Sequence, residues 1–126
     1  MREIKFRGMD IVNNKWLYGN LEIPLINQSK SKHFIVGHFY GQYQKLEVNP
    51  KTIGQYTGLK DKDGKGIYEG DIVECFNDGN SYVSFKGGAY GLIFDYSFIP
   101  FSDVYGEMKV IGNIYEHPHL LKEGEK

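Results

Sequence analysis

Residues 55–73 read QYTGLKDKDGKGIYEGDIV and form the densest cluster of turn residues in the chain. Asp63-Gly64 is typical of a tight turn, because Gly adopts positive φ at little cost. Glu69-Gly70 predicts a second reversal just before the apolar β-branched pair Ile72-Val73. Two turns this close predict a wrapped loop of a small barrel. Its backbone is set by Gly58, Gly64 and Gly70, and Ile72-Val73 begins a core strand.

The composition around this stretch is that of a β protein. The 126 residues include 16 Gly, 10 Tyr and 8 Phe. Aromatic residues suit a pleated, half-buried surface, and Gly supplies turns and bulges. No long stretch has a helical period. The sequence therefore predicts a mainly β fold with little helix.

The N-terminal region has a period-two pattern from its first residues. In a strand, Ile4 and Phe6 would point to one side, and Lys5 and Arg7 would be exposed on the other. A second extended run, residues 16–23, predicts an N-terminal hairpin. The first residues contain no continuous apolar run, so they resemble neither a signal peptide nor a membrane span. We expect a soluble, cytoplasmic protein with no membrane partner.

The chain length is that of one ordinary domain, and we expect a single domain over residues 1–126. Within it we distinguish an N-terminal hairpin region (about 1–50), a barrel region (about 51–121) and a frayed tail (122–126). The polar run 27–32 predicts an exposed loop. Cys75 is the only cysteine, which excludes an internal disulfide and a metal site built from several cysteines.

Three acidic side chains in the glycine-rich loop raise the question of a calcium site. Asp61, Asp63 and Glu69 carry the carboxylate oxygens that hard cations prefer. The spacing does not fit, because Gly64 directly follows Asp63 and the next acid is isolated. Turn chemistry is the favoured interpretation.

The nucleophile and metal-ligand candidates are equally sparse. To act as a nucleophile, Cys75 would need a base from His33, His38, His117 or His119. Its alternation with Val73 instead favours a small side chain buried in the core. His117 and His119 lack a third metal ligand, so we expect exposed histidines. We predict no catalytic residue, no metal and no cofactor, and therefore not an enzyme.

Two binding hypotheses remain. Arg2, Lys5 and Arg7 on one strand face, near aromatic residues, are compatible with single-stranded nucleic acid. The balance of 15 Lys and Arg against 16 Asp and Glu disfavours it. We expect the chain to have more aromatic side chains than a small barrel can bury. Exposed aromatic patches commonly mark protein interfaces.

Three segments together resemble the YopX family of small phage and prophage proteins. They are residues 1–8 (MREIKFRG) with 16–19 (WLYG), the stretch 54–73, and residues 110–116 (VIGNIYE) with Pro118, Leu120 and Leu121. Gly66 and Asp63 depart from the usual pattern, both within the turn. The resemblance implies a small SH3-like barrel, often self-associating, without an established activity, catalytic residue or ligand.

The resemblance and the residues together predict an accessory protein of a phage or prophage that acts by binding proteins. We expect a homo-oligomer that also contacts a phage or host protein. Nucleic-acid binding is the alternative, and an enzyme with an unrecognised site ranks third. The candidate interaction surface consists of Gln55, Tyr56, Lys60, Asp61, Arg2, Lys5 and Arg7.

Overall fold

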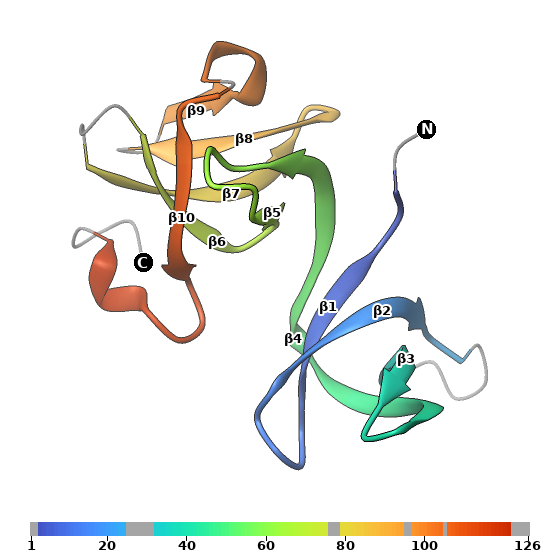
Figure 1. Ribbon diagram of the computed structural model, residues 1–126. Coiled ribbons are helices and arrows are strands. Elements are labelled where there is room, and N and C mark those ends of the chain that lie inside the picture. Colours follow the sequence, from blue (N-terminus) through green and yellow to red (C-terminus); the bar gives the residue numbers. More distant parts are fainter. Residues whose placement is uncertain (1–2, 25–31, 76–78, 95–96, 105, 122–126) are drawn as a thin grey trace. The chain divides into compact units, whose positions relative to one another are not determined.

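The computed structural model describes residues 3–24, 32–75, 79–94, 97–104 and 106–121 (Figure 1). The predicted tail 122–126 and most of the predicted loop 27–32 lie outside these residues. The strands are β1 (Phe6–Asp10), β2 (Trp16–Glu22), β3 (His33–Phe39), β4 (Gln42–Lys60), β5 (Gly66–Tyr68), β6 (Asp71–Cys75), β7 (Asn80–Lys86), β8 (Ala89–Phe94), β9 (Ser97–Pro100) and β10 (Met108–Asn113). Among the described residues, two single-turn 3-10 helices, η2 (Phe101–Asp103) and η3 (Pro118–Leu120), accompany them. The prediction of a mainly β fold with little helix is confirmed.

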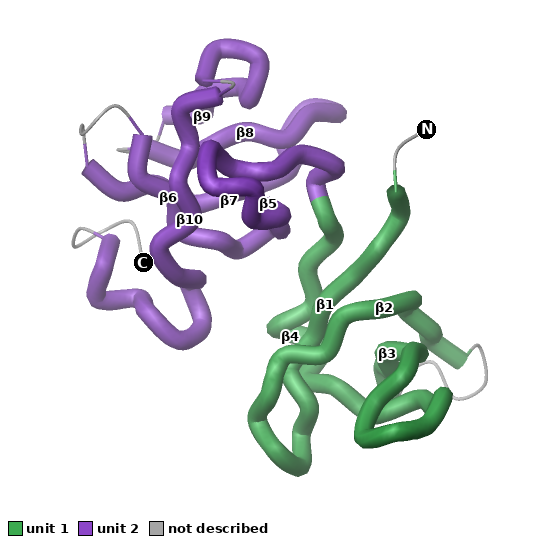
Figure 2. The backbone as a smooth tube through the Cα atoms, in the orientation of Figure 1, with its two compact units in different colours: residues 1–56 green, residues 57–126 purple. Residues whose placement is uncertain are grey.

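The chain divides into two compact units, residues 1–56 and residues 57–126, which we call the N-terminal and C-terminal units (Figure 2). The division falls inside β4, so this one strand supplies residues to both units. In the described part of the chain, no helix has the length and apolar character needed to cross a membrane.

The N-terminal unit contains more than the predicted hairpin. β1 and β2 do form an antiparallel hairpin, from Phe6 opposite Gly19 to Met9 opposite Trp16. β2 then pairs with β3, β3 with β4, and β4 returns to pair with β1. The four strands therefore form a closed ring, in which each strand pairs with one neighbour on each side.

A small core fills this ring. Leu17, Ile35 and Val48 are its buried members. They come from β2, β3 and β4, and partly buried side chains pack around them: Phe6, Leu21, Phe39, Leu46 and Ile53. Burial of these side chains supplies the main stabilisation of the unit.

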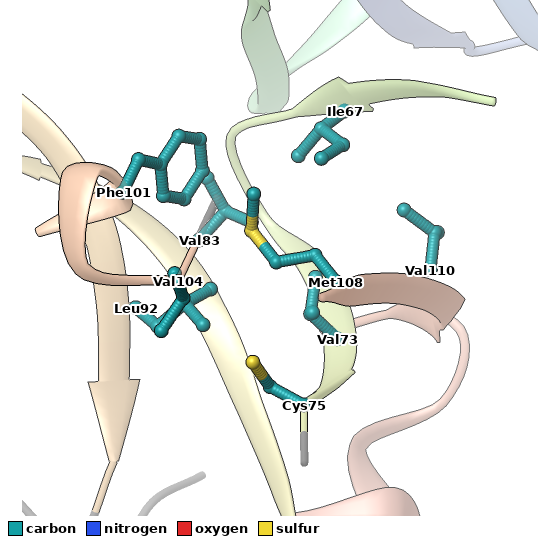
Figure 3. Packing of buried hydrophobic residues seen from close by; sticks show 9 residues of the cluster. All are labelled: Ile67, Val73, Cys75, Val83, Leu92, Phe101, Val104, Met108 and Val110. Atoms are coloured by element: carbon teal, nitrogen blue, oxygen red, sulfur yellow. The ribbon is translucent and has the colours of Figure 1, made fainter. Parts of the chain in front are cut away.

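The C-terminal unit is built on an antiparallel sheet with strand order β10-β6-β7-β8-β9. Its core cluster comprises Ile67, Val73, Cys75, Val83, Leu92, Phe101, Val104, Met108 and Val110 (Figure 3). Ile72 and Val73 are completely buried, which confirms that they begin a core strand. Cys75 points into the same cluster, as its alternation with Val73 predicts. The arrangement is compatible with the SH3-like barrel that the resemblance implies.

The two predicted turns of the opening stretch are present in the C-terminal unit. Gly58, Gly64 and Gly70 all have positive φ, at +88°, +86° and +88°. Gly64 closes the first turn through its N–H, which donates to the Asp61 carbonyl at 2.9 Å. These three glycines therefore set the backbone of the loop, as predicted.

Candidate functional site

The candidate surface residues do not form one exposed surface. Lys60 is exposed, Lys5 and Gln55 are half-buried, and Tyr56, Asp61 and Arg7 are buried. Arg2 lies outside the described residues. The buried side chains do not present a face to a partner: Arg7 packs against Trp16, and Asp61 accepts backbone hydrogen bonds.

Arg7 corrects the prediction of an exposed basic strand face. Its side chain is only 5% exposed, and its guanidinium carbon lies 4.5 Å from the centroid of the Trp16 ring. A guanidinium over an indole face is a favourable cation–π arrangement. Ile4, by contrast, is 65% exposed. A period-two pattern places side chains on alternate faces, but it does not show which face a neighbouring aromatic ring will cover.

Asp61 is a buried carboxylate that organises the loop. Its Oδ1 accepts the N–H groups of Asp63 and Lys65 at 2.9 and 2.8 Å, and its Oδ2 accepts that of Val110 at 2.9 Å. Burial acts to raise the pKa of Asp61, but the hydrogen bonds from Val110, Lys65 and Asp63 and the nearby Lys65 charge outweigh it, and the pKa is lowered. The geometry supports the turn-chemistry interpretation, because backbone donors occupy both oxygens.

The histidine and cysteine candidates also have structural contacts. His117 Nδ1 accepts the N–H of Asn113 at 3.1 Å, and its ring meets the His119 ring edge-on at 6.1 Å. His119 is exposed, whereas His117 is half-buried. Within the described ranges, no three His, Cys, Asp or Glu side chains gather as a metal site would require.

The feature that residue-by-residue reasoning missed is an apolar surface on the N-terminal unit. Eight large hydrophobic side chains are exposed among the described residues, and seven belong to this unit. They are Ile4, Ile11, Val12, Tyr18, Ile23, Tyr40 and Tyr43. Val12 is 79% exposed, and it lies in a turn, where small polar residues are the rule.

Ile11, Val12 and Tyr40 form what we call the two-turn surface, because two separate turns contribute to it. Asp10 holds the turns together: its Oδ1 accepts the N–H of Val12 at 2.8 Å, and its Oδ2 accepts Asn13 Nδ2 at 3.0 Å and the Tyr40 hydroxyl at 3.4 Å. Burial acts to raise the pKa of Asp10, but these hydrogen bonds outweigh it and the pKa is lowered. The surface is therefore preorganised by an ionised carboxylate.

The backbone of Tyr40 is unusual. Its φ is +54°, and Gly41 follows at +86°, so this hairpin turn requires two residues in the left-handed region. Asn, Asp or Gly normally occupies such a position, and a large side chain there costs roughly 1 kcal/mol or more. An exposed aromatic residue in a strained turn is better explained by a surface role than by stability.

A pocket of ≈ 400 Å³ lies beside this surface, within the N-terminal unit. Ile11 belongs both to the two-turn surface and to the pocket. The lining residues are Met9, Asp10, Ile11, Asn14, Glu47, Val48, Asn49 and Pro50. Apolar and acidic groups thus meet in one concave region.

Comparisons with known proteins agree with this fold. A family model described as YopX protein matches residues 5–122. Among solved structures, protein EF1440 from Enterococcus faecalis is 28% identical with a TM-score of 0.57, over 97% of this chain and 100% of that one. Protein yopX from Bacillus subtilis is 18% identical with a TM-score of 0.58, over 97% and 98%, and shows the shared fold. No curated protein matches.

Proposed function

The chain belongs to the YopX family, and from this premise we propose that it is a non-enzymatic binding or assembly module that acts through protein–protein contacts. Self-association is the first contact we propose, and a phage or host protein is the second. The proposal includes a role as a phage or prophage accessory protein in the bacterial cytoplasm.

The observation that carries the proposal is the concentration of exposed apolar side chains on the N-terminal unit. Scattered single hydrophobic residues are normal on a protein surface, but contiguous ones favour an interaction site. Asp10 accepts hydrogen bonds from the Val12 N–H and the Tyr40 hydroxyl, and Ile11 lies between Asp10 and Val12 in the chain, so the two turns keep a fixed arrangement in the free protein. A preorganised surface loses little conformational entropy when it binds.

Sedimentation of the purified full chain tests self-association directly. We expect the weight-average mass to rise with concentration and to exceed that of one chain at up to about 100 µM. A strict monomer over the whole range would contradict the self-association part of the proposal.

Tyr40→Asn separates binding from folding. Asn tolerates positive φ, so relief of the backbone strain should offset loss of the Tyr40–Asp10 hydrogen bond, and we expect the free energy of unfolding to stay within about 1 kcal/mol of the wild type. Loss of the aromatic ring should weaken self-association by roughly tenfold, as for a central interface aromatic. Urea unfolding and sedimentation measure the two effects.

The matched control is Ile4→Asn, which removes an exposed apolar side chain of the same unit outside the two turns. It should leave association unchanged. Equal weakening by both variants would show that general surface hydrophobicity, and not the two-turn surface, drives association.

Nucleic-acid binding remains a second candidate because of one observation. Residues 1–56 carry eight Lys and Arg against four Asp and Glu. Part of this charge is engaged: Lys45 Nζ lies 2.8 Å from Glu22, and Arg7 lies against Trp16. Fluorescence anisotropy with labelled single-stranded and duplex DNA at low salt tests it, and binding that weakens steeply with added salt would favour this candidate.

A further inference from the structure

The pocket of the N-terminal unit is lined by apolar and polar residues in equal number, and its two charged residues are both acidic. Met9, Ile11 and Pro50 supply accessible apolar atoms, and Val48 lies completely buried in the core beneath them. Its volume of ≈ 400 Å³ falls in the range typical of sites that enclose a small ligand or a side chain, about 300–1,000 Å³. The apolar lining residues would contact an inserted apolar group and remove its surface from water.

The charges of the pocket are of one sign. Asp10 and Glu47 line it, and none of the lining residues is Lys, Arg or His. Asp10 uses both carboxylate oxygens in hydrogen bonds within the unit, which leaves Glu47 as the other acidic residue of the lining. Lys32 Nζ approaches Glu47 only to 3.9 Å, and the Lys32 side chain is 68% exposed. Such an exposed, distant pair contributes little, so Glu47 remains able to attract another cation.

The C-terminal unit carries a segment with the complementary chemistry. Phe85 is 51% exposed and is the one exposed large hydrophobic side chain among the described residues of that unit. Lys86 follows it and is also exposed. Both lie at the end of the β7–β8 hairpin, where Gly87 and Gly88 form a tight turn with φ of +59° and +85°. An apolar ring beside a cation matches an apolar pocket beside a carboxylate.

Phe85 is also held in place before any contact is made. Its ring meets the ring of its cross-strand partner Tyr90 edge-on, with 4.9 Å between centroids. Tyr90 packs in turn against the core of the unit and stacks on Phe101 at 6.3 Å. A ring fixed in this way loses little freedom on binding.

We propose that the pocket of the N-terminal unit is a docking site for the β7–β8 hairpin tip of a second copy of the chain. Phe85 enters the pocket against its apolar lining residues, and Lys86 pairs with Glu47. The inference rests on the proposed self-association and names its two surfaces. Because these surfaces differ, the contact is heterologous, and it forms a reciprocal pair or a ring where the rotation closes and an open chain where it does not.

The first experiment is Phe85→Ala in the full chain. We expect self-association to weaken by roughly tenfold or more, while the melting curve stays close to that of the wild type, because the side chain is largely exposed. Tyr43→Ala is the matched control, since Tyr43 is an exposed aromatic residue on β4 that does not line the pocket. It should associate like the wild type.

The second experiment exchanges the charges. Glu47→Lys and Lys86→Glu should each weaken association, because each places like charges together in the contact. An equimolar mixture of the two variants should associate like the wild type, since every contact between unlike copies pairs a Lys with a Glu. Contacts between two N-terminal units would not produce this rescue.

The outcomes separate this inference from the proposed function. If the wild type is monomeric, this docking site and the self-association part of the proposed function are both wrong. If the wild type associates but Phe85→Ala associates equally well, or if the charge-exchanged mixture is not rescued, self-association stands and this docking site is wrong. Loss of association on Phe85→Ala together with rescue in the mixture supports the site.

Discussion

Gly70→Val is expected to lower the free energy of unfolding by roughly 3 kcal/mol or more, with a fall in melting temperature of roughly 10 °C or more. Gly70 has a φ of +88°, which a β-branched residue adopts only under strain. Space is also short: an added Cβ would lie 3.0 Å from Cε2 and 3.3 Å from the hydroxyl of Tyr115. Thermal unfolding followed by circular dichroism measures the effect.

The backbone of Gly70 is also held on both sides. Its N–H donates to the Val83 carbonyl at 3.1 Å, and its carbonyl accepts the N–H of Ile114 at 2.8 Å. A shift that relieved the strain would break bonds to β7 and to the segment after β10. The strain therefore stays in the folded state and lowers the free energy of unfolding.

Gly64→Val is the matched control. Gly64 has a φ of +86°, but an added Cβ there meets no atom within 4 Å. It should therefore show the conformational cost alone, and the difference between the two variants reports the contact with Tyr115. A Gly70→Val protein that melts with the wild type would contradict the role given to this glycine.

Asp61→Ala is expected to destabilise the protein by roughly 2–4 kcal/mol, because three backbone N–H donors lose a charged acceptor. Two of these donors, Asp63 and Lys65, shape the loop, and Val110 belongs to β10. The carboxylate thus joins the end of β4 to β10, 49 positions away in sequence from Asp61 to Val110. Urea unfolding at neutral pH measures the loss. Asp63→Ala, at an exposed position, should change stability by no more than about 0.5 kcal/mol.

The same carboxylate predicts a pH dependence. Its pKa is lowered in the folded state from an ordinary value of 3.8. The stabilisation is therefore complete above pH 3.8, where the unfolded chain is also ionised, and is lost as the pH falls through the lower folded-state value. The stability difference between wild type and Asp61→Ala should be constant near neutral pH and shrink in acid. A difference that grows in acid would contradict this assignment.

The local backbone was predictable because it depends on neighbouring residues. Gly58, Gly64 and Gly70 were predicted to set the loop, and all three have positive φ. Ile72-Val73 and Cys75 were predicted to be buried on a strand, and they are. A glycine turn and an alternating apolar strand are each determined by a few neighbouring residues. A single sequence is therefore enough to predict them.

The candidate surface was less predictable, because exposure depends on residues distant in sequence. Arg7 was predicted to be exposed but lies against the Trp16 ring, and Asp61 is buried because Val110 reaches it from β10. Ile11 and Val12 offered the one usable signal, two β-branched apolar residues in the turn between β1 and β2. The link from Val12 to Tyr40 through Asp10 could not be predicted from the order of residues.

The amino-acid sequence by itself determined the family, the mainly β class and the glycine-dependent double turn, since motifs and turn chemistry are local. Only the tertiary structure decided that β4 returns to β1 and closes the N-terminal ring. It also decided which apolar side chains remain exposed beside the pocket. The physical reason is that burial and strand closure depend on contacts between segments far apart in the chain, which no local pattern records.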